Sequence, residues 1–155
     1  MTALKVREIR IEDIEDILEI EKACFKIPWS REAFEEEILR NELAYYLVLV
    51  DDNSAENFQK VIGYAGMWKV FDEAHITNIA LLPSYQGKKY GYHLVNELIE
   101  LAKKIGVYSI TLEVRSSNII AIALYEKLLF KQEGLRKGYY TDTNEDALIM
   151  WRNIL

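Results

Sequence analysis

The sequence has a single cysteine, Cys24, and this scarcity excludes an internal disulfide. A chain without disulfides fits a reducing compartment, so we expect a cytoplasmic protein. Histidine is also scarce, since only His75 and His93 are present and they lie far apart in the sequence. Neither has metal-ligand spacing with Cys24, and the chain has no zinc motif and no Ser-His-Asp arrangement. We therefore expect no metal site.

Long apolar runs and an excess of basic residues are absent as well. No apolar run approaches the roughly 18–20 residues that a membrane span needs, so we expect no membrane association. The first residues soon alternate between apolar and charged types, unlike those of a signal peptide. The 25 acidic residues outnumber the 19 lysines and arginines, and a net charge of −6 argues against non-specific nucleic-acid binding.

The residues that are present are typical of one folded domain spanning residues 1–155. Apolar alternation predicts strands near residues 5–10, 45–50, 61–70, 74–82, 107–114 and 147–151, with extended chain from Phe130. Helical spacing predicts helices from Ile14 towards Phe25, after a Ser30 cap, from about Gly91 to Ile105, and after residues 116–118. The polar residues 51–57 indicate a hairpin loop. This order predicts an α/β domain with a mixed sheet covered by helices on both faces.

Residues 78–94 form the most informative stretch. They combine a buried strand, an exit marked by Pro83, a loop containing Gly87 and Gly91, and the first turn of an amphipathic helix. That order places backbone N–H groups at the positive end of a helix, where glycines let a ligand approach the backbone closely. The stretch therefore predicts a binding site for a phosphate or pyrophosphate.

The loop from Gln86 to Gly91 resembles the Q/R-x-x-G-x-G/A signature of the GCN5-related N-acetyltransferases (GNATs), which bind acetyl-coenzyme A. Further segments resemble the RimI-like branch, which acetylates protein N-termini and includes the ribosomal-protein alanine acetyltransferases. These segments are residues 23–30 (ACFKIPWS), 72–74, 112–115, 117–118, 121–126, 139–140 and 145–147. The resemblance covers essentially the whole chain. It implies a GNAT-type fold with acetyl-coenzyme A as co-substrate.

Glu113 and Tyr125 are the candidate catalytic residues. Glu113 lies on the face of its strand opposite Leu112 and Val114, where a carboxylate is costly unless it is paired or near solvent. The strand pattern alone favours a carboxylate at the sheet rim paired with Arg115 or a lysine. The resemblance implies instead that Glu113 is the proton acceptor. Tyr125 alone would be interpreted as a packed aromatic, and the resemblance implies that it protonates the coenzyme sulfur.

The resemblance also implies the coenzyme contacts. A strand backbone would bind the pantetheine arm, the loop would cradle the pyrophosphate, and Asn118, which can equally cap a helix, would contact the coenzyme. The implied residues are Ile79, Ala80, Leu81, Gly87, Lys88, Lys89, Tyr90, Gly91, Tyr92 and Asn118. Lys89 stands where the signature has its first glycine. A lysine there is strained if φ is positive and unstrained if it simply leads into a helix. We expect its N–H to face the pyrophosphate and its ammonium group to add a charge contact.

The resemblance also implies residues that contact the acceptor substrate, although each of them could equally be a packing residue or a solvated residue. They are Pro28 and Trp29 in a helix–helix loop, Tyr139 and Tyr140 in the opposing β-hairpin, and Glu73. Cys24 follows an apolar helix face, so we interpret it as a small buried residue and expect direct attack within a ternary complex. The leading function is acetylation of a protein N-terminus, with ribosomal proteins among the candidate acceptors. Acetylation of a lysine side chain or a small amine, and a non-catalytic acyl-coenzyme A sensor, are the alternatives. Narrow and broad specificity both stay open.

Overall fold

The computed structural model describes residues 3–53 and 58–154, and within them it contains one seven-stranded sheet and four α-helices. The strands are β1 (Ala3–Glu8), β2 (Ala44–Asn53), β3 (Phe58–Val70), β4 (Glu73–Leu81), β5 (Ser109–Arg115), β6 (Lys131–Tyr140) and β7 (Glu145–Asn153). The helices are α1 (Ile14–Cys24), α2 (Arg31–Leu39), α3 (Tyr90–Lys104) and α4 (Ile119–Lys127), with short 3-10 turns η1 (Ile11–Asp13) and η2 (Pro83–Tyr85). This order confirms the predicted α/β domain.

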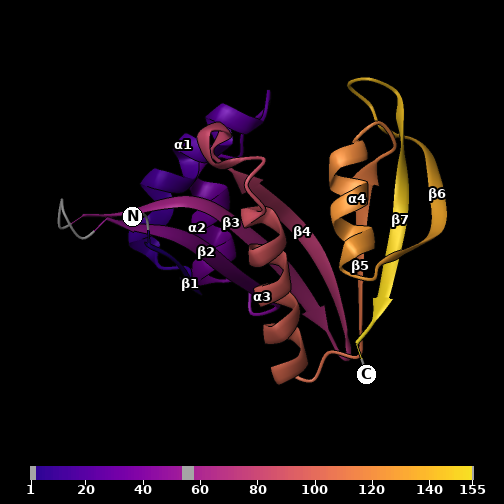
Figure 1. Ribbon diagram of the computed structural model, residues 1–155, viewed down its shortest axis with the longest axis horizontal. Helices are drawn as coiled ribbons and strands as arrows, with labels where there is room; N and C mark the ends of the chain where they lie inside the picture. Colours follow the sequence, from indigo (N-terminus) through magenta and orange to yellow (C-terminus); the bar gives the residue numbers. More distant parts are fainter. Residues whose placement is uncertain (1–2, 54–57, 155) are drawn as a thin grey trace.

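The sheet has the order β1-β2-β3-β4-β5-β7-β6. Neighbouring strands are antiparallel except β4 and β5, which are parallel, so the sheet is mixed as predicted. All of residues 46–50 in β2 are buried, which requires cover on both faces of the sheet. Helices α1 and α2 pack against one face of β2–β4, and α3 packs against the other (Figure 1). No helix among the described residues is both long and apolar enough to cross a membrane.

Local signals in the sequence explain the helix boundaries. The Ser30 hydroxyl accepts a hydrogen bond from the Ala33 N–H (3.1 Å) at the start of α2, as a capping residue does. Gly106 follows α3 with a φ of 86°, a left-handed conformation that glycine adopts without strain. Part of the predicted hairpin loop at 51–57 is strand instead. Strand β2 continues to Asn53 and β3 begins at Phe58, and residues 54–57 lie outside the described part of the chain.

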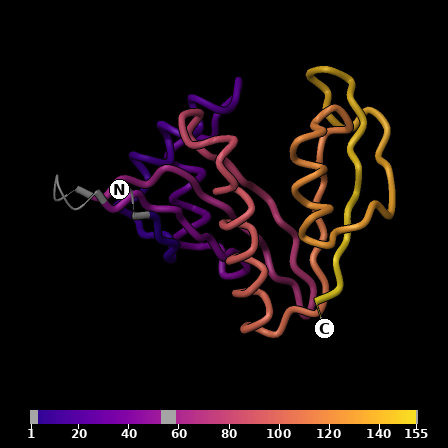
Figure 2. Tube along the Cα trace, in the orientation of Figure 1, coloured from indigo at the N-terminus to yellow at the C-terminus, as the bar shows by residue number. Residues whose placement is uncertain are grey.

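The feature that positions the candidate site is the divergence of β4 from β5. The two strands pair only where Glu73–His75 face Ser109–Thr111. Beyond that point β4 contains a β-bulge, because Gly66 pairs with Asn78 while Met67 pairs with Ile76, which leaves Thr77 as an extra residue. The strands then separate, as the Cα trace shows between the magenta and orange segments (Figure 2). The rest of β4 therefore has a strand neighbour on its β3 side only.

Candidate active site

A cavity of about 430 Å³, which we call the loop cavity, lies where β4 has separated from β5. It is lined by Cys24, Phe25, Ile79, Ala80, Leu81, Gln86, Gly87, Lys89, Gly91, Tyr92, Asn118, Ile120, Ala121, Leu124 and Tyr125. Eight of the ten predicted coenzyme-binding residues are therefore brought together around one cavity. The other two do not line it: Lys88 is exposed, and Tyr90 packs against Tyr85 with ring centroids 6.2 Å apart.

The loop before α3 contains two residues with left-handed backbone. Gly87 has a φ of +76°, and a Cβ added there would meet no atom within 4 Å. Glycine is thus favoured at this position by backbone conformation rather than by lack of space. Lys89 has a φ of 69° and is also the residue that precedes the first turn of α3. The strained reading of Lys89 therefore holds: the lysine precedes the helix, but it does so in a left-handed conformation that is costly for a residue with a side chain.

The carbonyl oxygen of Leu81, at the end of β4, is hydrogen-bonded to two side chains. It accepts hydrogen bonds from the Gln86 amide (2.9 Å) and from the Cys24 thiol (3.1 Å). Burial, assisted by the nearby Glu21, raises the pKa of Cys24 above its usual value. The group is therefore a thiol at neutral pH, and only a thiolate would be an effective nucleophile. Cys24 is half-buried rather than fully buried as expected, and its thiol form argues against a role as a covalent acyl carrier.

A second cavity of about 410 Å³, which we call the carboxylate cavity, adjoins the first. It is lined by Glu21, Phe25, Ile27, Trp29, Thr77, Asn78, Ile79, Glu113, Val114, Arg115, Asn118, Ala121, Tyr125 and Tyr140. Five of these residues, Phe25, Ile79, Asn118, Ala121 and Tyr125, line both cavities. A group held in one cavity can consequently reach a group held in the other.

Glu113 extends from β5 into the carboxylate cavity, and its side chain is only 15% exposed. Buried Leu112 and Val114 point to the other face of the strand, which confirms the predicted alternation. One carboxylate oxygen lies 2.5 Å from His75 Nε2, and the other lies 3.8 Å from Arg136 Nε. The partner predicted from the strand pattern was Arg115 or a lysine. The partners found come from β4 and β6 instead, because those strands lie beside β5 and its neighbour β7 in the folded sheet.

Tyr125 of α4 lies on the wall shared by the two cavities and is 5% exposed. Burial, with a smaller contribution from Tyr140, raises its pKa to about 12. Its hydroxyl is therefore protonated throughout the neutral range and can donate a proton. The ring also packs edge-on against Phe130, with centroids 5.8 Å apart. The packing interpretation and a proton-donor role are compatible.

The predicted acceptor residues divide into two groups. Trp29 and Tyr140 line the carboxylate cavity, whereas Pro28, Tyr139 and Glu73 line neither cavity. Tyr139 packs edge-on against Tyr140 at 5.1 Å between centroids. Glu73 is the first residue of β4, at the end where β4 and β5 are still paired. The structure does not bring Glu73 to the cavities, because they form only where the strands have separated.

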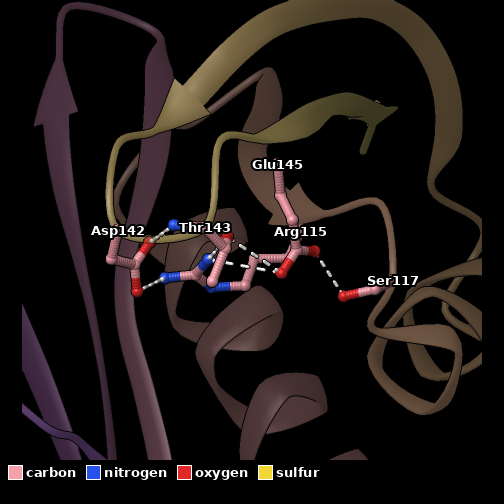
Figure 3. A network of polar contacts seen from close by, with 5 residues as sticks. All are labelled: Arg115, Ser117, Asp142, Thr143 and Glu145. Atoms are coloured by element: carbon pink, nitrogen blue, oxygen red, sulfur yellow. Dashed lines mark hydrogen bonds and ion pairs between the residues drawn. The ribbon is translucent and has the colours of Figure 1, made fainter.

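A polar network ties the β6–β7 hairpin to the end of β5 (Figure 3). Arg115 donates hydrogen bonds to Asp142 and Thr143, both at 3.0 Å, and lies 3.6 Å from Glu145. Its guanidinium group also lies over the Tyr140 ring, 4.1 Å from the centroid. The network therefore holds Tyr140 at the wall of the carboxylate cavity.

Comparison with known families agrees with this geometry. A model described as "Acetyltransferase (GNAT) family" matches residues 14–130, which include both cavities apart from Tyr140 of the hairpin. The chain belongs to the GNAT family. The loop cavity of this GNAT protein is built around the signature loop, and Lys89 is the departure from that signature.

Related proteins align with this chain over almost its whole length. A Bacillus subtilis protein provisionally named [ribosomal protein bS18]-alanine N-acetyltransferase is 44% identical over 99% of this chain and 97% of its own length. The crystal structure of the ribosomal-protein-S18-alanine N-acetyltransferase from Escherichia coli superposes with a TM-score of 0.86 at 34% identity, covering 98% of this chain and 94% of that one. Arabidopsis thaliana NAA60 in complex with acetyl-CoA has a TM-score of 0.87 at 18% identity, covering 98% and 100%, and shares the fold.

Sequence reasoning missed three residues of the carboxylate cavity or its surroundings: Glu21, His75 and Arg136. His75 was considered only as a metal ligand and was set aside because it lacks metal-ligand spacing. Among the described residues, no group of three or more His, Cys, Asp or Glu could hold a metal. The spacing could not show that His75 lies beside Glu113, since the contact joins residues 38 positions apart on neighbouring strands. For Glu21, the available signal was an acidic residue in the last turn of a helix, where the helix dipole disfavours negative charge.

Proposed function

We propose that this GNAT protein transfers an acetyl group from acetyl-coenzyme A to the free α-amino group of a protein N-terminus, by direct attack within a ternary complex. The proposal rests on one observation, namely that the loop cavity and the carboxylate cavity are both lined by Tyr125. One cavity contains the signature loop, and the other contains a partly buried carboxylate, Glu113, with space beside it. Two substrates can therefore be bound at once with their reactive groups adjacent, which direct transfer requires.

The loop cavity has the features that acetyl-coenzyme A needs. The edge of β4 around Ile79 has no strand neighbour among the described residues, so its backbone can pair with an extended, amide-bearing arm. The open backbone of Gly87 and the N-terminus of α3 provide N–H groups for a pyrophosphate. The coenzyme would supply the acetyl group as an activated thioester. Gly87, Lys89, Gly91 and Asn118 are the residues that we propose to hold its polar parts.

Glu113 and Tyr125 provide the two proton transfers. An α-amino group has a pKa of about 7.7–8.0, so at neutral pH much of it is protonated and cannot attack. Glu113 accepts that proton, and the His75 ring and the Arg136 guanidinium group beside its oxygens hold the carboxylate in place. Tyr125 is protonated, since burial keeps its pKa at about 12, and it donates a proton to the departing thiolate. The nitrogen loses its second proton as the amide forms, and that proton replaces the one that Tyr125 has given up.

The relatives narrow the choice of acceptor to be tested first. Both bacterial proteins reported above carry names that specify an alanine of ribosomal protein S18. We therefore propose a protein N-terminus that begins with alanine as the first acceptor to test. The aromatic walls of the carboxylate cavity, Trp29 and Tyr140, suit an extended peptide segment.

The test is the release of coenzyme A from acetyl-coenzyme A in the presence of peptides that begin with Ala, Ser, Thr, Met-Leu or Met-Glu. A peptide with an acetylated start and a peptide with an internal lysine are the controls. Turnover confined to free N-termini is the expected result, and the ranking of rates separates narrow from broad specificity. Acetylation of the lysine side chain in the second control peptide would indicate a side-chain acetyltransferase. Tight coenzyme binding without any turnover would refute the enzymatic assignment and indicate a sensor.

A further inference from the structure

A buried carboxylate in the carboxylate cavity has no role in the mechanism above. Glu21 lies in the last turn of α1, is 2% exposed, and lines the cavity. It accepts a hydrogen bond from the Trp29 N–H at 2.9 Å and another from the Tyr64 hydroxyl. Burial and Glu21 raise the pKa of Tyr64, so Tyr64 remains a neutral donor. Both partners of Glu21 are therefore uncharged.

The two acidic side chains that line this cavity differ in their surroundings. Glu113 has a histidine and an arginine within 4.0 Å of its oxygens. Glu21 has no lysine, arginine or histidine within that distance among residues 3–53 and 58–154. A buried carboxylate is costly without a cation, and the C-terminal end of a helix adds to that cost. Glu21 is thus the acidic group of the cavity that has no cationic partner among the described residues.

We propose that Glu21 binds the α-ammonium group of the acceptor, in addition to holding Trp29 in the loop between α1 and α2. The inference rests on the proposed function, because it assigns the missing cation to the substrate amine. The ammonium form dominates at neutral pH, given a pKa of about 7.7–8.0 for an α-amino group. Glu21 recognises that form on binding, and Glu113 takes the proton before attack. Glu21 therefore selects acceptors that have a free N-terminus.

The experiment compares two peptides that differ only in the amine. One begins with alanine, and the other carries a propionyl group in place of the alanine, which removes the amine and keeps the methyl group and the carbonyl. Their dissociation constants are measured by calorimetry on the protein saturated with coenzyme A, so the readout is independent of turnover. The wild type should bind the amine peptide about 10- to 100-fold more tightly, which is the range for a hydrogen bond to a charged group.

Three variants separate recognition of the amine from support of the loop. Glu21→Gln removes the charge and should abolish most of the difference between the peptides. Tyr64→Phe removes a hydrogen bond to Glu21 but keeps its charge, so the difference should persist. Glu113→Gln should also keep it, because the Glu113 carboxylate already has the Arg136 guanidinium group beside it.

Equal weakening of both peptides by Glu21→Gln would reduce Glu21 to a structural support of the loop and overturn the inference. So would a wild type that does not distinguish the peptides or binds neither, or a difference that disappears only in Glu113→Gln. The proposed function has a separate criterion, namely wild-type turnover of the amine peptide. The two proposals can therefore fail independently.

Discussion

Replacing Lys89 with glycine has two effects of opposite sign, and the structure allows both to be estimated. The Lys89 backbone has φ 69° and ψ 10°, and a residue with a side chain in that region costs about 1–2 kcal/mol. Glycine removes this cost but gives the unfolded chain more freedom, which offsets about 0.5–1 kcal/mol. We expect Lys89→Gly to raise the free energy of unfolding by up to about 1.5 kcal/mol, or Tm by up to about 6 °C for a chain of this size.

The same substitution should weaken coenzyme binding. Lys89 is exposed at the wall of the loop cavity, where its ammonium group can contact a pyrophosphate only through a screened interaction. Such a contact contributes about 0.2–1 kcal/mol, so the dissociation constant of coenzyme A should rise by up to about fivefold. The dependence of that constant on salt should also decrease, because one charge contact is lost.

Lys89→Ala is the matched control, since it removes the ammonium group and keeps the left-handed strain. It should weaken coenzyme binding as Lys89→Gly does, without raising Tm. Thermal unfolding without ligand and calorimetric titration with coenzyme A at two salt concentrations measure both effects. Equal Tm values for the two variants would refute the strain argument. Unchanged affinity and salt dependence in both would refute the charge contact.

Further predictions concern the proposed catalytic residues and their neighbours. Glu113→Gln should remove most of the turnover at neutral pH while the affinity for coenzyme A, measured by calorimetry, stays nearly unchanged; equal activity would exclude Glu113 as the base. His75→Ala should lower kcat/KM by about fivefold, the value of roughly 1 kcal/mol for a lost hydrogen bond to a catalytic group, and His75→Gln should restore part of it. Tyr125→Phe should slow turnover by about 10²-fold or more, and a normal rate would leave Tyr125 with a packing role alone. Burial raises the pKa of Tyr125 from 10.0 to about 12. The folded state therefore keeps this proton at a pH where the unfolded chain loses it, and the free energy of unfolding should fall by about 2–3 kcal/mol as the pH rises from 10 to 12. Urea unfolding across that range should show a smaller loss in Tyr125→Phe. Arg115→Met should raise the peptide KM while the KM for acetyl-coenzyme A is unchanged, because it releases Tyr140 and the hairpin without touching the signature loop; equal changes in both would contradict this.

Local structure was predictable because its causes are local. The Ser30 cap, the break after α3 at Gly106 and the alternation around Glu113 each depend on residues within a few positions. The order of helices and strands followed from apolar periodicity in the same way. The signature loop was found as a strand, turn and helix N-terminus that are contiguous in the sequence.

The contacts of the candidate site were harder to predict because they join distant parts of the chain. Glu73 was expected near the acceptor, but it lies where β4 and β5 are still paired. His75 was set aside for its spacing, yet it contacts Glu113 on the neighbouring strand. Glu21 drew no attention as one of many acidic residues, and only its burial against Trp29 and Tyr64 distinguishes it.

The sequence by itself determined the order of the elements, the anion-binding loop and the face of β5 on which Glu113 lies. Those properties depend on periodicity, capping and backbone preference, which act over a few residues. Tertiary structure alone decided where β4 separates from β5, and hence that two cavities form and share Tyr125. It also decided that, among the described residues, Glu113 has an arginine and a histidine beside its carboxylate whereas Glu21 has only uncharged partners. Strand pairing and burial set these features, and both depend on residues that are far apart in the chain.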